Sequence, residues 1–352
     1  MKASDQKGIY MSDIEKTGHV PAVTIVVAAC NVEKYIRECL ESLVAQTITD
    51  IEIICVDDCS SDATGRIIDE LAENDDRIRV FHNERNLGVS ESRNLGIDEA
   101  RADYICFVDG DDIAAPDMSE LLFKEATSVG ADLVIGDYYV ADGDTARWES
   151  FYGGRDISRE RMERDAILGI NGLSTSVGVP WGRIYKRSFL LEKGIRFVPG
   201  LKRMQDMIFN NYVFELAGKI SFVNKPIYYY RIHRSSAVRA MDMGFADTAA
   251  IIMDELRSFA AKYNKEWEEV LITKEMNLLL EAITLYPLRK AKSLTYCQKI
   301  AYIRSASDKL LSELYAHRGN VGGSSLFKLK YFLMKRQMFG SLYLLCKIRY
   351  IF

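Results

Sequence analysis

The chain has 352 residues and a formal net charge of −4, and hydrophobic residues make up 48% of it. This composition is typical of a globular protein, and the negative balance argues against nucleic acid as a partner, because duplex binding needs a dense basic surface. No secretory signal is recognisable, and no apolar run reaches the roughly eighteen residues that a membrane span needs. Seven cysteines, most of them within apolar runs, fit a reducing compartment. We therefore expect a cytoplasmic protein.

Residues 1–20 form a polar tail, after which strands and helices alternate. The expected elements in this half are strand Val23–Val27, a helix marked by Ile36 to Val44, strand Ile51–Val56, a helix marked by Ile67 to Leu71, strand Ile78–Phe81, helix Glu91–Ala100 and strand Tyr104–Val108. Such alternation predicts a parallel, Rossmann-like α/β sheet with helices on both faces. The carboxyl ends of its strands then point at one common crevice.

The pattern changes in the second half of the chain. The expected elements are helix Leu121–Val129, strand Leu133–Val140, a loop with a short helix at Arg161–Ile170, helix Lys186–Lys193, a helix carrying Ile208 to Leu216, strand Ser221–Val223 and strand Ile227–Ile232. After these the apolar periodicity is helical only. The sequence therefore predicts an α/β domain at residues 21–240 and a C-terminal helical region at residues 241–352.

The last segment, from Leu326 onward, mixes apolar residues with lysines and arginines. This pattern fits two alternatives: a peripheral contact with the inner face of a membrane or with a partner, and a helix that closes the C-terminal bundle. An oligomer is also compatible with the sequence.

Aspartates follow two of the expected strands at the point where each strand ends. Asp57 and Asp58 follow the second strand, and Asp109-Gly110-Asp111-Asp112 follows the fourth. Carboxylates this close repel one another unless a cation or hydrogen-bond donors compensate. Their hard oxygens suit Mn²⁺ or Mg²⁺, which usually complete their shells with substrate phosphates, so a diphosphate is the expected partner. The alternative is an Asp/Gly turn that caps the helix starting near Pro116.

The order of these segments resembles glycosyltransferase family 2, whose members have the GT-A fold. The similar segments lie within residues 22–240 and include Val23–Asn31, Ser42–Thr47, Ile54–Asp62 and Asn86–Asn94. The resemblance implies an inverting transferase that uses a nucleotide sugar, with UDP as the expected nucleotide. It implies metal ligation by Asp109 and Asp111 and a bond from Asp58 to the uracil. The implied contacts to the nucleotide sugar are Ala28, Asn31, Asp58, Arg93, Asp109, Gly110, Arg231 and His233.

Two segments depart from the family pattern. Ala28 or Ala29 and Cys30 stand where a Pro and a Tyr are usual, which affects the packing of the nucleoside. Gln205 stands where the family commonly has Glu, but the following Asp206 is retained, so the resemblance implies that Asp206 is the catalytic base. Asp206 then takes the proton of the acceptor hydroxyl in a single displacement that inverts the anomeric carbon. The alternative is a first-turn carboxylate that the helix dipole favours.

Four further residues are candidates for contacts with the substrates, and for two of them a structural interpretation is also open. Arg93 could reach the uracil or a phosphate, or could be an ordinary salt-bridging arginine. Arg231 and His233 lie in a segment similar to the family's late loop and are candidates for contacts to the diphosphate. Trp181 could stack on the acceptor sugar or be a core tryptophan.

These features predict an enzyme that moves a sugar from a UDP donor to a glycan or lipid-linked glycan in bacterial cell-surface polysaccharide synthesis. Two alternatives stay open. A sugar nucleotidyltransferase shares the crevice and the metal, but it typically carries a Gly-rich, basic phosphate loop, which the segment from Ala28 to Asn31 lacks. A non-catalytic sugar-nucleotide or glycan-binding module would be favoured by loss of Asp111 or Asp206, and both are present.

Overall fold

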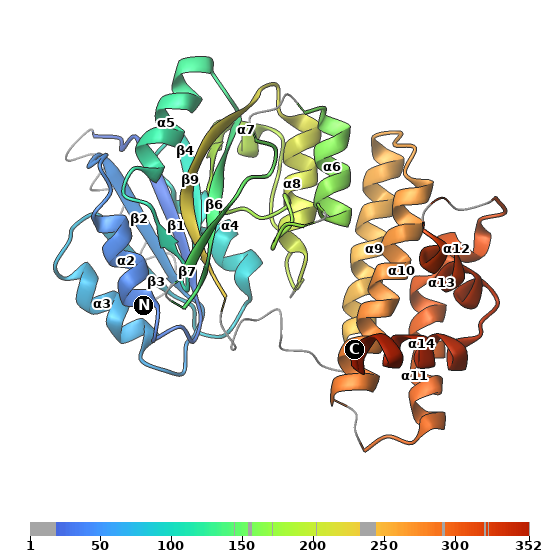
Figure 1. Ribbon diagram of the computed structural model, residues 1–352. Coiled ribbons are helices and arrows are strands. Elements are labelled where there is room, and N and C mark those ends of the chain that lie inside the picture. Colours follow the sequence, from blue (N-terminus) through green and yellow to red (C-terminus); the bar gives the residue numbers. More distant parts are fainter. Residues whose placement is uncertain are drawn as a thin grey trace.

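The computed structural model describes residues 19–143, 145–153, 157–170, 172–201, 203–232, 244–290, 293–319, 322 and 324–351. The described chain has two parts: a sheet with helices on both faces, and a group of helices from residue 245 onward (Figure 1). The predicted fold class, an α/β sheet followed by a C-terminal helical region, is confirmed. Most of the predicted tail and the predicted boundary at residue 240 lie outside the described residues, so the division into domains stays a proposal.

The carboxyl ends of the parallel strands lie at one edge of the sheet. Its strands are β1 (Val23–Ala29), β2 (Ile51–Asp57), β3 (Ile78–His82), β4 (Tyr104–Asp109), β5 (Ile113–Ala114), β6 (Leu133–Asp142), β7 (Thr145–Glu149), β8 (Arg183–Lys186) and β9 (Ile220–Arg231). Their order is β3-β2-β1-β4-β8-β6-β9-β5, with β7 paired to β6. The first four predicted strands pair in parallel, as expected. Beyond β4 the sheet is mixed, because β8 runs antiparallel to both β4 and β6.

Four strands differ from the prediction. β5 has only two residues and was not expected. β7 lies in a predicted loop, and it lacks an apolar alternation because its first four residues are exposed and only Glu149 is buried. β8 has only four residues, too few for a periodic signal. The two short strands predicted after residue 220 form one strand, β9, whose pairing with β6 is irregular next to Pro226, a residue without an amide hydrogen to donate.

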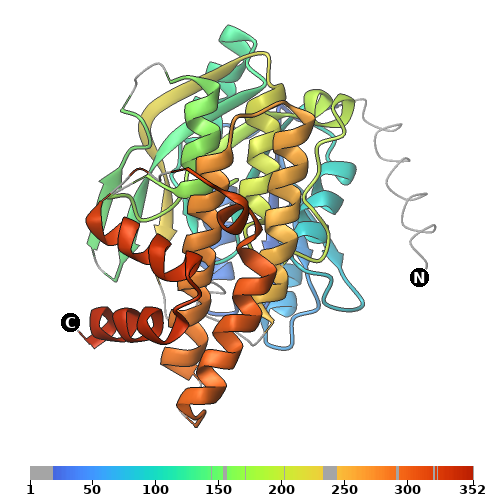
Figure 2. The same ribbon diagram turned by 90° about the vertical axis from the view of Figure 1, so that its right-hand side faces the viewer.

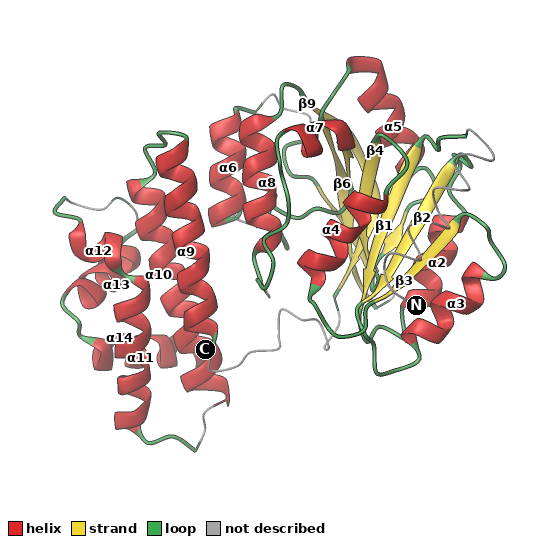
Figure 3. Ribbon diagram, turned by 180° about the vertical axis from the view of Figure 1, so that it is seen from behind, coloured by secondary structure: helices red, strands yellow, loops and turns green. Residues whose placement is uncertain are grey.

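Seven helices of the described chain accompany the sheet. They are α2 (Ile36–Val44), α3 (Thr64–Ala72), α4 (Val89–Glu99), α5 (Met118–Val129), α6 (Arg159–Leu168), α7 (Arg187–Glu192) and α8 (Gln205–Leu216). Helix α4 packs against β1 and β2, whereas α2 and α3 lie on the opposite face (Figures 1 and 3). The approach of α4 to β1 requires Gly96, because a Cβ there would lie 2.2 Å from Val26 Cγ1. This close packing fixes Arg93, which stands three residues earlier on α4.

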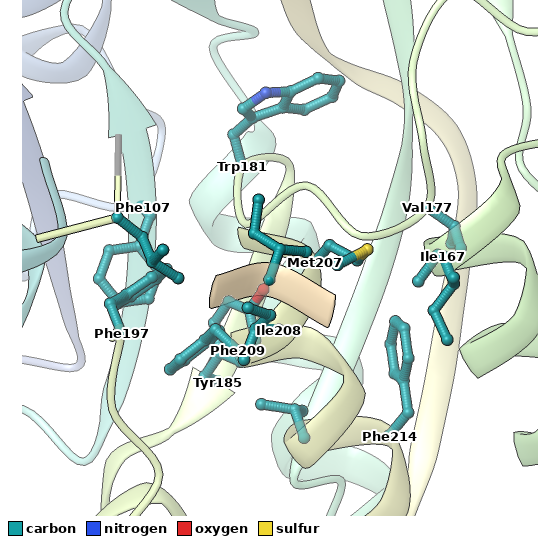
Figure 4. Close-up of a cluster of buried hydrophobic side chains, with 14 of the residues drawn as sticks. Phe107, Ile167, Val177, Trp181, Tyr185, Phe197, Met207, Ile208, Phe209 and Phe214 are labelled. Carbon is teal, nitrogen blue, oxygen red and sulfur yellow. The ribbon is translucent and has the colours of Figure 1, made fainter. Parts of the chain in front are cut away.

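An aromatic cluster holds α8 in place (Figure 4). Phe209 of α8 stacks on Phe197 with ring centroids 3.9 Å apart. Phe107 of β4 meets both rings edge-on, at 5.3 Å and 6.1 Å. Burying one such side chain contributes about 1.5–3 kcal/mol. The first turn of α8 therefore has a fixed position relative to the end of β4.

The C-terminal part consists of helices that pack on one another and on the α/β part (Figure 2). They are α9 (Phe245–Lys262), α10 (Glu268–Ile283), the π-helical turn η2 (Thr284–Lys290), α11 (Tyr296–Leu310), α12 (Ser312–Ala316), α13 (Ser325–Lys335) and α14 (Phe339–Ile351). Lys265 pairs with Glu163 of α6 at 3.0 Å, and Arg203 pairs with Glu281 of α10 at 3.2 Å. A search of the described helices finds none that combines the length and the apolar character needed to cross a bilayer.

Candidate active site

A cavity of about 430 Å³ lies where β1, β2 and β4 end, a volume in the range of small-molecule sites. Most of the residues that the sequence singled out line it. Its lining comprises Ala28, Ala29, Cys30, Val32, Asp58, Val89, Ser92, Arg93, Asp109, Gly110, Asp111, Asp112, Thr175, Val179, Trp181, Arg203, Met204, Gln205, Asp206, Tyr230, Arg231 and Glu281. Asn31 is not part of this lining, and His233 lies outside the described residues.

Asp109, Asp111 and Asp112 form an acidic cluster at the end of β4, in which one carboxylate oxygen from each lies within 4.8 Å of the other two. Asp112 is 1% exposed, and its carboxylate accepts hydrogen bonds from the Tyr228 hydroxyl and the Arg231 amide, both at 2.8 Å. Burial and the charges of Asp111 and Asp109 raise the pKa of Asp112 well above its usual value. The cluster thus carries more negative charge than its neighbours compensate, and its hard oxygens fit Mn²⁺ or Mg²⁺.

Asp58 presents a carboxylate at the end of β2. One oxygen accepts hydrogen bonds from the Asn83 side chain at 2.7 Å and the Leu87 amide at 2.8 Å, and the other accepts one from the Gly88 amide at 2.7 Å. The residue is 3% exposed. Because an ionised carboxyl group has about four acceptor positions, one remains for a donor in the cavity.

Arg93 links the acidic cluster to Asp206. One terminal nitrogen donates to Asp206 Oδ1 at 2.6 Å, and the other donates to Asp109 Oδ1 at 2.7 Å. The guanidinium also lies over the Phe197 ring, 5.2 Å from its centroid. Burial opposes the charge of Arg93, but the two carboxylates outweigh burial and raise its pKa. Of the two interpretations of Arg93, the structure therefore shows the salt bridge.

Asp206 stands in the first turn of α8, where the backbone before it is strained. Met204 has φ 58°, in the left-handed region that a methionine rarely adopts. Burial raises the pKa of Asp206; Arg93 opposes this effect, and Asp109 adds to it. A raised pKa makes a carboxylate a stronger base.

The other predicted residues differ in what they contact. Trp181 is 3% exposed and stacks on Tyr228 with centroids 4.7 Å apart, so it is a core residue that also lines the cavity. Arg231 lines the cavity and contacts the acidic cluster through its backbone amide. The Asn31 side-chain oxygen accepts hydrogen bonds from the amide and the hydroxyl of Ser61, at 2.8 Å and 3.0 Å. Asn31 thus stabilises a turn, and no contact with the cavity is seen for it.

Among the charged lining residues, three had no specific role in the sequence analysis: Asp112, Arg203 and Glu281. For Asp112 a signal existed, because it directly continues the Asp-Gly-Asp motif. For Glu281 there was none, because it belongs to a helical segment far along the chain from every acidic motif. Only the packing of α10 against the α/β part brings it to the cavity.

Comparisons with known proteins agree with this architecture. Residues 24–192 match the family described as Glycosyl transferase family 2. EpsH of Bacillus subtilis (strain 168) is 35% identical over 249 residues, which cover 70% of this chain and 71% of that protein. The succinoglycan biosynthesis protein ExoO of Rhizobium meliloti (strain 1021) is 30% identical over 246 residues, 68% of this chain and 70% of that protein.

Among solved structures, S. aureus TarS 1-349 in complex with UDP-GlcNAc has a TM-score of 0.62 at 20% identity and covers 93% of this chain and 91% of that chain. This likeness extends over both the sheet and the C-terminal helices, and it shows a GT-A fold. The family match and the two curated relatives show the family. The chain is a glycosyltransferase and belongs to glycosyl transferase family 2.

Proposed function

We propose that this glycosyltransferase moves a sugar from a UDP-sugar to a glycan or lipid-linked glycan in cell-surface polysaccharide synthesis, with inversion and with Mn²⁺ or Mg²⁺. One observation carries the mechanism: the acidic cluster and Asp206 face one cavity, and Asp109 of the cluster and Asp206 are bound to the same guanidinium, that of Arg93. The UDP-GlcNAc bound to TarS supports the donor class. The succinoglycan role named for ExoO supports the polysaccharide class.

The donor is proposed to lie between Asp58 and the acidic cluster. The remaining acceptor position of Asp58 suits the imide N–H of a uracil, and the small side chains of Ala28 and Ala29 leave room beside it. Asp109 and Asp111 are the proposed metal ligands, with Asp112 next to them. A cation bound there supplies positive charge opposite the departing diphosphate.

Asp206 is the proposed general base. It accepts the proton of the acceptor hydroxyl as that oxygen bonds to the anomeric carbon, while the bond from this carbon to the diphosphate breaks and its electron pair leaves with UDP. Attack from the side opposite the leaving group inverts the configuration. Arg93 acts as a positioning residue, because it fixes one oxygen of Asp206 and leaves the other for the hydroxyl.

The test is a screen of UDP-sugars with and without Mn²⁺, followed by Asp206→Asn with the most active donor. We expect this variant to bind UDP normally and to lose transfer about 10²- to 10⁴-fold, the usual contribution of a general base. Asp76→Asn, an exposed aspartate remote from the cavity, is the control. Transfer at the wild-type rate by Asp206→Asn would rule out the base assignment.

The C-terminal segment is proposed to contact an anionic membrane surface. Residues 322–352 contain six lysines and arginines and no acidic residue, although the whole chain has a net charge of −4. Several apolar side chains of α13 and α14 are 42% to 58% exposed: Leu326, Leu329, Phe332, Leu344 and Ile348. Basic charge beside exposed apolar surface is the pattern of interfacial helices.

Sedimentation with vesicles tests this contact. We expect binding to vesicles that contain phosphatidylglycerol, weak binding to pure phosphatidylcholine, and loss of binding in a Leu329→Ser/Phe332→Ser double variant. Ile251→Ser, a half-exposed apolar residue on α9, is the control. If the double variant bound as well as the wild type, these helices would not be the contact.

A further inference from the structure

The C-terminal helical region contributes one carboxylate to the active-site cavity. Glu281 lies in the last turn of α10 and lines the cavity together with Arg203, Gln205 and Asp206. One of its oxygens lies 3.2 Å from Arg203 Nη1, and its side chain is 31% exposed. The proposed base therefore shares its cavity with an acidic group that is not part of the sheet or of the metal cluster.

Two cations stabilise this carboxylate. Burial raises the pKa of Glu281 and outweighs Arg203 and Lys274, which lower it, so the net shift is upward. Lys274 stands two turns earlier on α10, is 8% exposed, and donates a hydrogen bond from its ammonium to the Ile167 carbonyl at 2.9 Å. Burial lowers the pKa of Lys274 to about 8, and the charge of Glu281 opposes this effect. Arg203 thus holds the Glu281 carboxylate in place, while part of the side chain stays accessible.

Gln205 adds an acceptor without a partner. It is 7% exposed and lines the cavity directly before the proposed base. Within the part of the chain that the structure describes, its Oε1 atom makes no hydrogen bond. Leaving a buried acceptor unsatisfied costs about 1–3 kcal/mol, so a bound ligand with a donor group would remove a penalty that the free protein carries.

We infer that Glu281 and Gln205 bind hydroxyl groups of the acceptor sugar, beside the hydroxyl that Asp206 deprotonates. This inference rests on the proposed function and specifies its acceptor. The Glu281 carboxylate and Gln205 Oε1 only accept hydrogen bonds, and sugar hydroxyls donate them. The carboxylates of Glu281 and Asp206 disfavour an anionic group at this position, even though each also pairs with an arginine. The reacting sugar of the acceptor is therefore neutral and carries free hydroxyls next to the one that reacts.

The experiment uses the full chain with Mn²⁺ and UDP, and it probes binding with p-nitrophenyl glycosides of glucose, galactose, N-acetylglucosamine and glucuronic acid. Binding is measured by ligand-observed NMR, and transfer is measured with the donor found in the UDP-sugar screen. We expect the wild type to bind at least one neutral glycoside and to bind it in preference to the glucuronide.

Glu281→Gln keeps the size of the side chain and removes its charge. A hydrogen bond to a charged group accounts for about a tenfold to hundredfold change in affinity, so acceptor KM and glycoside Kd should rise by that factor. The Kd for UDP should stay unchanged. Gln205→Leu should raise acceptor KM in the same direction. Glu269→Gln changes an exposed glutamate on the same helix outside the cavity and should alter neither constant.

Melting temperatures distinguish this role from a merely structural ion pair. If Glu281→Gln lowered the melting temperature and left acceptor KM and glycoside Kd unchanged, the pair with Arg203 would only join the two parts of the chain, and the inference would be wrong. It would also be wrong if the UDP-loaded wild type bound no neutral glycoside. Failure of the wild type to bind UDP or to use any UDP-sugar would instead contradict the proposed function.

Discussion

Replacing Arg93 by Met tests whether this side chain joins Asp206 to Asp109 of the acidic cluster and sets the protonation of Asp206. Met is close to Arg in length but carries no charge, so the variant removes the hydrogen bonds to Asp206 and Asp109 and preserves most contacts with the Phe197 ring. Arg93 lowers the pKa of Asp206 against the effect of burial. Its removal therefore raises that pKa further, and a base that must be deprotonated is then protonated over a wider pH range.

The size of the effect follows from the bond that is lost. A hydrogen bond to a charged group contributes about 1.5–3 kcal/mol, and about 1.4 kcal/mol corresponds to a tenfold change in a protonation equilibrium. In a profile of kcat/KM against pH, the acidic limb should therefore move to higher pH by about one to two units, with the largest loss of activity on that limb. At pH 8.5 the loss should be smaller, because most of the base is then deprotonated.

Arg66→Met is the matched control, because Arg66 is 74% exposed on α3 and does not line the cavity. This control should keep the wild-type profile. Circular dichroism verifies that Arg93→Met is folded. A profile for Arg93→Met with the acidic limb of the wild type, even at reduced rate, would show that Arg93 does not set the protonation of the base.

Three further predictions concern stability. Burial and neighbouring charges raise the pKa of Asp112, so its ionisation destabilises the metal-free fold as the pH rises above the pKa that Asp112 has in the unfolded chain. Asp112→Asn should therefore raise the melting temperature without metal at pH 7 and reduce the increase in melting temperature that Mn²⁺ produces. An unchanged increase with Mn²⁺ would contradict this. Gly96→Ala, which places a Cβ 2.2 Å from Val26, should cost about 1–3 kcal/mol in urea unfolding and lower activity through Arg93, whereas the unobstructed Gly322→Ala should do neither. Burial lowers the pKa of His82, but Asp69 and Asp57 outweigh burial, so the net shift is upward. The two aspartates therefore stabilise the fold fully below the pKa that His82 has in the unfolded chain. This stabilisation is lost as the pH rises through the pKa of His82 in the folded protein. His82→Asn should therefore be less stable than the wild type at pH 5.5. The difference should be under about 1 kcal/mol, because the His82 side chain is half exposed, and it should shrink by pH 9. A difference in stability that stays constant with pH would contradict the pairing of His82 with the two aspartates.

The parallel part of the fold could be predicted from the sequence because its strands are buried on both sides. β1, β2 and β4 are nearly continuous apolar runs, and β1 and β2 are each followed by a helix with its own apolar spacing. The acidic motifs follow these strands directly, so the sequence placed Asp58 and Asp109 at one edge. The mixed half of the sheet gave weaker signals, because β7 is exposed and β8 is short.

The contacts within the site could not be predicted for a different reason. Whether Arg93 reaches a nucleotide or two aspartates depends on the direction of its side chain, which α4 and Gly96 determine only after folding. Glu281 reaches the cavity through the packing of α10 on the α/β part, and no local pattern encodes that approach. The sequence therefore indicates which side chains stand at the end of a strand, but it does not indicate which helices pack over that end.

The most direct test of the mechanism is a crystal of the protein with UDP and Mn²⁺, measured at the manganese absorption edge. We expect an anomalous peak between the UDP diphosphate and the carboxylates of Asp109 and Asp111, the uracil within hydrogen-bond distance of Asp58, and Asp206 facing the space beyond the diphosphate. A peak away from this cluster, or UDP bound elsewhere, would contradict a metal-assisted displacement at this site.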